Sequence, residues 1–126
     1  MRKLFIALFL FTGLVACKSK SAYNYNQEVL KLEKSLEVDI KATENNVERY
    51  IGEDNYDSIA VAGKKMEQLV QQKIDIINDK PAPKVKEGDN FKAASLRYFR
   101  FIKSMYTGYK ELGLAKTEEA RGDCKG

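Results

Sequence analysis

Apolar residues recur every three or four positions through most of this chain, which is the spacing of one buried face of an α-helix. The first such stretch predicts a helix that is capped at Asn24, with Gln27 completing a capping box, and that ends at Gly52-Glu53-Asp54. Its expected core positions are Tyr25, Val29, Leu32, Leu36, Ile40, Thr43, Val47 and Tyr50.

A second helix is predicted to start at Asn55 and to stop before Asp79-Lys80-Pro81-Ala82-Pro83, because proline disfavours helix before it and cannot continue one. Gly63 lies inside this helix, where glycine costs about 1 kcal/mol relative to alanine. We therefore expect it to permit the close approach of another helix. The core positions are Tyr56, Ile59, Gly63, Met66, Val70, Ile74 and Ile77.

A third, aromatic helix is predicted to be capped by Asp89 or Asn90 and to end at Gly113, a residue type common just after a helix. Thr117-Glu118-Glu119 is typical of the start of a fourth helix, which Gly122 would end at once. The stripe expected to face the core of the third helix is Ala94, Tyr98, Phe101 or Ile102, Met105, Tyr109 and Leu112.

These patterns predict an all-α protein, an antiparallel up-down-up helical bundle of three long helices, because strand-like alternation is missing. We expect the bundle to occupy residues 23–113 and residues 114–126 to form a tail or an aborted fourth helix. Three helices with one-sided stripes also leave a groove where a fourth helix would lie.

The first 17 residues resemble a targeting signal. Arg2 and Lys3 precede an apolar run, 4–11, which is too short to span a bilayer. The run leads to Leu14-Val15-Ala16-Cys17, which resembles the bacterial lipoprotein signal at every position. The resemblance implies that residues 1–16 are a signal peptide, that cleavage precedes Cys17 and that Cys17 carries acyl chains, including palmitate. Residues 17–22 would then be a lipidated tether, and three acyl chains suffice for stable anchoring.

Removal of the first 16 of 126 residues leaves 110 and lowers the net charge from +4, by the charges of Arg2 and Lys3, to +2. That weak charge argues against nucleic-acid binding, which needs a dense basic face. Lys18 replaces the Asp that retains some lipoproteins in the inner membrane, so we expect an outer-membrane location. The basic segment 18–21 favours the periplasmic face over the cell surface.

The amino-acid composition excludes several kinds of catalytic and metal-binding site. The chain has no His and two Cys, which excludes Ser–His–Asp catalysis, His-ligated zinc and a disulfide-rich scaffold. Glu118 and Glu119 are adjacent and point in different directions on a helix, so they cannot act as a catalytic pair. The polar stretch 53–57 lacks the glycine and distal glutamate of a calcium loop. We therefore expect no enzyme, no cofactor and no metal ion.

Three segments together resemble a family of small bacterial lipoproteins known only as surface proteins of unknown function. They are Tyr25-Asn26, the helix end from Ile74 to Pro81, and the aromatic block from Phe91 to Ser104. The resemblance implies a helical bundle after the lipobox and carries over no catalytic residue. Family members continue into a long charged fourth helix, so this chain is either truncated at its C-terminus or a short three-helix member.

The function that follows is a membrane-anchored envelope lipoprotein acting as an interaction or structural module at the outer membrane. Its expected partners are the membrane, through the acyl chains, and an envelope protein or a second copy. The alternative is a carrier that binds a small hydrophobic ligand between the second and third helices. Its pocket would be formed by Tyr98, Phe101, Met105 and Tyr109, unless these residues simply belong to the bundle core.

Overall fold

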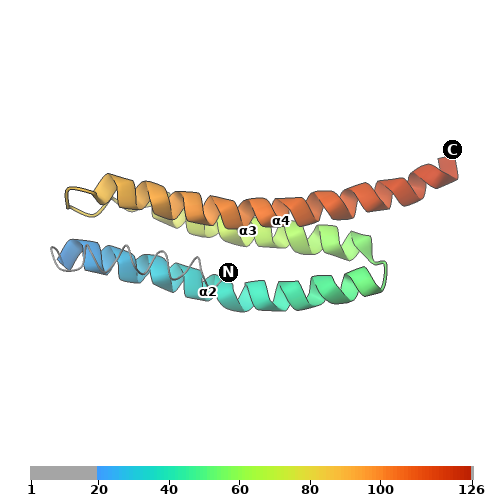
Figure 1. Cartoon of the computed structure of the whole chain (residues 1–126), viewed down its shortest axis with the longest axis horizontal. Coiled ribbons are helices and arrows are strands. Elements are labelled where there is room, and N and C mark those ends of the chain that lie inside the picture. The colour runs from blue at the N-terminus through green and yellow to red at the C-terminus, as the bar shows by residue number, and fades with distance from the viewer. Residues whose placement is uncertain (1–19, 126) are drawn as a thin grey trace.

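The protein folds as three antiparallel α-helices in a computed structural model that describes residues 20–125, with side chains described up to 119 (Figure 1). They are α2 (Lys20–Gly52), α3 (Tyr56–Asp79) and α4 (Gly88–Lys125). Helices α2 and α4 run in the same direction and α3 returns between them (Figure 1). The predicted all-α bundle of three long helices is confirmed.

Local signals set the boundaries of α3. The side chain of Asn55 accepts a hydrogen bond from the amide of Ser58 at 3.3 Å, which satisfies one free donor of the first turn. Asp54, just before this cap, has a left-handed φ of 54° that reverses the chain. At the other end, the Lys80 amide donates to the carbonyls of Ile76 and Ile77, and the prolines follow. The predicted start of this helix is confirmed, and Asp79, which was expected to follow the helix, is its last residue.

Helix α2 begins earlier than the sequence predicted. The helix already includes Lys20, so Asn24 lies inside it and does not cap it. The reason is packing: Ala22 is buried and Ser21 accepts a hydrogen bond from the amide of Lys84 in the loop before α4. These contacts stabilise one more helical turn than the capping pattern alone requires.

Helix α4 does not end at Gly113, and the predicted fourth helix at Thr117 is instead a continuation of α4 through residues 114–125. The physical reason lies in packing. A Cβ placed on Gly113 would lie 2.5 Å from the backbone nitrogen of Ala60, so this glycine permits a helix contact and does not terminate a helix. The Thr117 hydroxyl lies 3.1 Å from Asp57 of α3, extending that contact.

Gly63 provides the matching contact from α3, as its position in the sequence suggested. A Cβ at this position would lie 2.6 Å from the backbone nitrogen of Lys110 and 2.7 Å from the carbonyl oxygen of Tyr106. One glycine from each helix therefore brings the backbones of α3 and α4 together. Most predicted core positions of α2 and α3 are buried, but α4 is rotated. Its most buried large side chains are Phe91, Phe99, Ile102 and Tyr106.

Replacing Gly63 or Gly113 by alanine should destabilise the protein, although alanine is the better helix former. The added methyl must push the two backbones apart, at a cost of about 1–3 kcal/mol. Gly108 is the matched control for Gly113: both lie in α4, but a Cβ on Gly108 would meet nothing within 4 Å. Gly108→Ala should instead stabilise the protein by up to about 1 kcal/mol. Urea unfolding followed by circular dichroism measures both, and equal effects of Gly113→Ala and Gly108→Ala would contradict this account.

Candidate interaction surface

Glutamate–tyrosine hydrogen bonds join α2 to α4, and two of them are related by a repeat in the sequence. The Tyr98 hydroxyl donates to Glu33, and the Tyr109 hydroxyl donates to Glu44 at 3.0 Å. In each pair the glutamate and the tyrosine are 65 residues apart in the sequence. Consequently the two glutamates are eleven residues apart on α2, and the two tyrosines are eleven residues apart on α4. Eleven residues make close to three helical turns. Two parallel helices can therefore repeat the same contact further along.

Glu33 is a buried carboxylate, with only 2% of its surface exposed. Its pKa is raised, chiefly because burial disfavours the charged form, although the hydrogen bond from Tyr98 partly offsets this effect. Burial and the facing Glu33 carboxylate likewise raise the pKa of Tyr98. The tyrosine therefore remains protonated and acts as a hydrogen-bond donor.

Glu44 receives two tyrosines. The Tyr106 hydroxyl lies 3.5 Å away, and the rings of Tyr106 and Tyr109 meet edge to face with centroids 5.4 Å apart. Burial first, and then the negative charge of Glu44, raise the pKa of Tyr106. These aromatic residues fill the space between α2 and α4 while satisfying the carboxylate.

The contact of α4 with α3 carries its own polar network. Glu67 accepts a hydrogen bond from Thr107 and pairs with Lys110 at 2.8 Å, and Lys103 donates to Gln71 at 2.6 Å. Burial pushes the pKa of Glu67 up, but its bonds to Lys110 and Thr107 outweigh this, so its pKa is lowered. Side chains on this flank of α4 are thus committed to α3.

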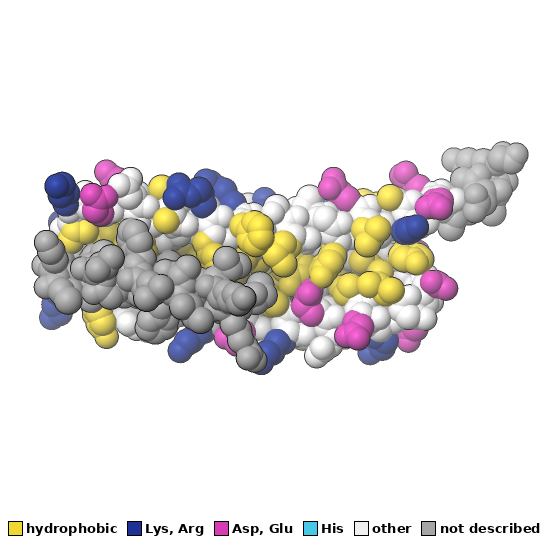
Figure 2. Space-filling view, in the orientation of Figure 1, with side chains coloured by type: hydrophobic (Ala, Val, Ile, Leu, Met, Phe, Trp, Pro, Cys, Tyr) yellow, Lys and Arg dark blue, Asp and Glu magenta, His cyan; other side chains and the backbone are white. Residues whose placement is uncertain are grey.

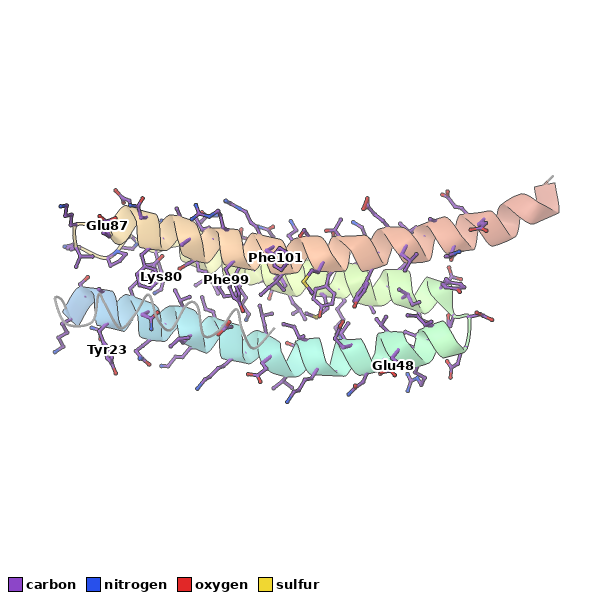
Figure 3. All side chains as sticks on the ribbon, in the orientation of Figure 1. Tyr23, Glu48, Lys80, Glu87, Phe99 and Phe101 are labelled. Carbon is purple, nitrogen blue, oxygen red and sulfur yellow. The ribbon has the colours of Figure 1, made fainter. Side chains whose placement is uncertain are left out.

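A third side of α4 faces outward and is apolar. Phe101 and Leu112 are 52% and 43% exposed, and Ala94 and Met105 are half-buried. These four residues, the outer strip, recur at helical spacing on one side of α4. Figure 2 shows apolar side chains along the seam between α2 and α4, and Figure 3 contrasts Phe101 with the buried Phe99. A surface of this kind is typical of an interaction site.

Charged residues border this surface on both sides. On α2, the exposed Glu37 and Glu48 each follow a tyrosine-bonded glutamate by one turn, and Lys41 lies between them. On α4, Arg97 lies one turn before Phe101 and is exposed. Arg100 and Glu111 are exposed further round α4. The surface thus has an apolar centre and two charged edges.

The four residues proposed for a hydrophobic pocket do not share one environment. Tyr98 and Tyr109 are half-buried and bond to α2, whereas Phe101 and Met105 belong to the outer strip. The structure therefore divides them between a helix contact and an outer surface. None of the three cavities described next is lined by any of them.

The first cavity, of about 360 Å³, opens between α2 and α3 and has mixed polar and apolar walls that include Asp39, Lys65 and Met66. A second lies beside the loop before α4, and a third is a shallow depression on α3 and α4 lined by Val61 and Leu114 among others. The carrier hypothesis placed its ligand between the second and third helices. At Gly63 and Gly113 those two helices are in backbone contact.

The predicted lipobox and signal peptide lie outside the residues that the structure describes; this includes Leu14, Val15, Ala16 and Cys17. Within residues 20–125, none of the helices combines the length and apolar character needed to cross a bilayer. Among residues 20–119, whose side chains the structure describes, no cluster of acidic or cysteine side chains is arranged to bind a metal ion. Comparison with known protein families, curated proteins and solved structures finds no match.

The interhelical glutamates were not among the sequence predictions. Glu33 and Glu44 read as part of the polar side of an amphipathic helix, since a buried carboxylate without a visible partner is improbable. The available signal was the shared spacing: acids eleven residues apart on the first helix and tyrosines eleven residues apart on the third. Only together do these spacings indicate a repeated contact.

Glu33→Gln tests the buried carboxylate. Glutamine keeps an acceptor for Tyr98 but removes the charge. Because the folded pKa of Glu33 is raised above 4.5, the wild-type carboxylate favours folding most when protonated, and that advantage is lost as pH rises through the folded pKa. The variant should therefore melt at a higher temperature than wild type at pH 7, and the difference should vanish toward about pH 4.

The exposed Glu48→Gln, on the same helix but away from Glu33 and Tyr98, serves as the control, and its melting temperature should follow wild type at both pH values. Thermal melts monitored by circular dichroism suffice. A Glu33→Gln protein that is less stable at pH 7 than at pH 4, relative to wild type, would refute the assignment of Glu33 as a buried charge.

Proposed function

We propose that this chain is a lipid-anchored bacterial envelope protein whose helical bundle is an interaction module, with the outer strip of α4 as its contact surface. The proposal places the protein at the outer membrane, on its periplasmic face. The observation that carries the interaction role is the exposure of Phe101 and Leu112 beside a well-packed core. Folding gains nothing from leaving these two large side chains in water.

The anchor is supported by the sequence Leu14-Val15-Ala16-Cys17 and by the start of α2. Because α2 includes Lys20, only Lys18 and Ser19 separate the helix from Cys17. Acyl chains on Cys17 would hold the bundle close to the membrane. The loop before α4 lies at the same end, since the Lys84 amide bonds to Ser21 at 3.2 Å.

The proposed contact surface is supported by the different environments of the three sides of α4. One side of the helix packs on α3, the next donates tyrosine hydroxyls to α2, and the third carries the outer strip. An apolar centre with charged edges is also the usual anatomy of a protein–protein interface. The strip therefore fits a protein partner.

Cys17→Ser should abolish anchoring. Serine has no thiol to accept the diacylglyceryl group, so the protein should remain uncleaved or appear in the soluble fraction. Membrane fractionation combined with labelling by radioactive palmitate measures this directly. Cys124→Ser is the matched control and should leave labelling and membrane association unchanged. A Cys17→Ser protein that is still mature and labelled would exclude the anchor.

The contact surface can be tested in living cells with a photo-crosslinking residue. Phe101→p-benzoylphenylalanine should give discrete protein adducts after irradiation, because the strip would lie against a partner. Ile76 is the control position: it is 43% exposed on α3, a helix that contributes neither to the outer strip nor to its charged edges. Crosslinking there should give no discrete adduct. Equal yields at the two positions, or none at Phe101, would rule out the strip as an interface.

A further inference from the structure

We propose that a cavity at one end of the bundle binds the anionic phosphate of a membrane lipid headgroup. This cavity of about 530 Å³, the end cavity, lies between the start of α2 and the segment that joins α3 to α4. Its walls include Ser21, Tyr25, Glu28, Lys80 and Lys84. The proposal rests on the proposed lipid anchor and adds a second, specific contact with the same membrane.

The first observation is a buried hydroxyl without an acceptor. Tyr25 is only 5% exposed, and its hydroxyl has no hydrogen-bond partner among the residues that the structure describes. A buried donor that is left unpaired costs free energy, which an acceptor would recover. Burial first, and then the charge of Glu28, raise the pKa of Tyr25, so the hydroxyl keeps its proton. An acceptor oxygen is therefore what the end cavity lacks.

The charged groups of the end cavity favour an anionic acceptor. Lys80 pairs with Glu28, whereas the ammonium group of Lys84 has no ion-pair partner among the described side chains. Two lysines against one glutamate leave one positive charge in excess on the cavity walls. A phosphate group supplies both the matching charge and several acceptor oxygens.

The segment that covers the end cavity is held to α2 by contacts at the surface. The exposed Lys84 amide donates to Ser21 at 3.2 Å, and Lys80 pairs with Glu28, whose side chain is 54% exposed. Exposed ion pairs contribute little to stability, so a modest shift of this segment can admit a phosphate oxygen to Tyr25. The cavity volume is also far larger than the roughly 30 Å³ that one water occupies. It therefore has room for a headgroup.

The position of the end cavity favours a lipid as the source of the phosphate. Figure 3 places Lys80 at the same end of the bundle as Tyr23 and Glu87, which belong to the start of α2 and to the loop before α4. Ser21, in the cavity wall, lies four residues after Cys17. The proposed acyl chains would thus hold the cavity at the level of the lipid headgroups.

The charge of this end as a whole is balanced. Three exposed lysines, Lys20, Lys84 and Lys86, are offset by three exposed acids, Asp79, Glu87 and Asp89. Such a surface lacks the cluster of basic residues that draws a protein to an anionic membrane. A preference for anionic lipid must therefore come from the end cavity itself. Lys84 lines the cavity, whereas Lys86 does not, which provides a matched pair for substitution.

Thermal melting of the full-length lipidated protein in vesicles tests this inference. The vesicles contain phosphatidylcholine, whose phosphate is neutralised by choline, either alone or mixed with the anionic lipid phosphatidylglycerol. Phosphatidylglycerol should raise the melting temperature of wild type by about 4–8 °C. Tyr25→Phe and Lys84→Gln should each lose most of this increase, because each removes one donor to the phosphate. Lys86→Gln should keep it.

Tyr25→Phe also carries an internal control for folding. Phenylalanine keeps the edge-to-face contact that Tyr25 makes with Phe91, at 5.5 Å between ring centroids. The variant loses only an unpaired hydroxyl, so in phosphatidylcholine alone it should melt no lower than wild type. Flotation of the vesicles reports the anchor separately, and wild type and every variant should float with both lipid mixtures.

The possible failures are distinguishable. Protein that floats but melts at the same temperature in both mixtures would overturn the headgroup site and leave the anchor standing. Equal losses in Lys84→Gln and Lys86→Gln would overturn it in favour of general electrostatic attraction. A rise produced by inorganic phosphate in phosphatidylcholine vesicles, and lost in Tyr25→Phe, would assign the cavity to a free anion and overturn the lipid. Wild type that does not float would overturn the anchor and the lipid source together.

Discussion

The backbone contact between α3 and α4 is the constraint from which the other packing follows. Gly63 on one helix and Gly113 on the other leave no room for a Cβ, so the two helices lie closer together than side chains normally permit. That contact fixes the rotation of α4 about its own axis. Phe91, Phe99 and Ile102 consequently turn into the core, and the neighbouring sides of the helix are left for other contacts.

Helix α2 completes the bundle by a different kind of contact. Tyr98 and Tyr109 cross the space between α2 and α4 and donate to Glu33 and Glu44, so aromatic rings and carboxylates act together as spacers. A buried carboxylate costs free energy unless it is hydrogen-bonded. The pairs therefore disfavour any arrangement of α2 and α4 in which the glutamates lose their tyrosine donors. They hold α2 in one register relative to α4.

The same rotation gives the molecule its apolar surface. Once α4 has turned its core side inward and its tyrosines toward α2, Phe101, Met105 and Leu112 remain outside. They are exposed because two other contacts take precedence on the same helix.

The sequence alone determined that the protein is a bundle of three long helices, because apolar spacing, the Asn55 cap and the two prolines are local signals. It also pointed to Gly63 as a place of close approach. It did not determine which side of α4 is buried, since two adjacent apolar stripes run along that helix. Nor could it distinguish Gly113 as a packing residue from a helix end, or give Glu33 and Glu44 their tyrosine partners. Those choices depend on residues about 50 to 65 positions away, and only tertiary packing brings them together.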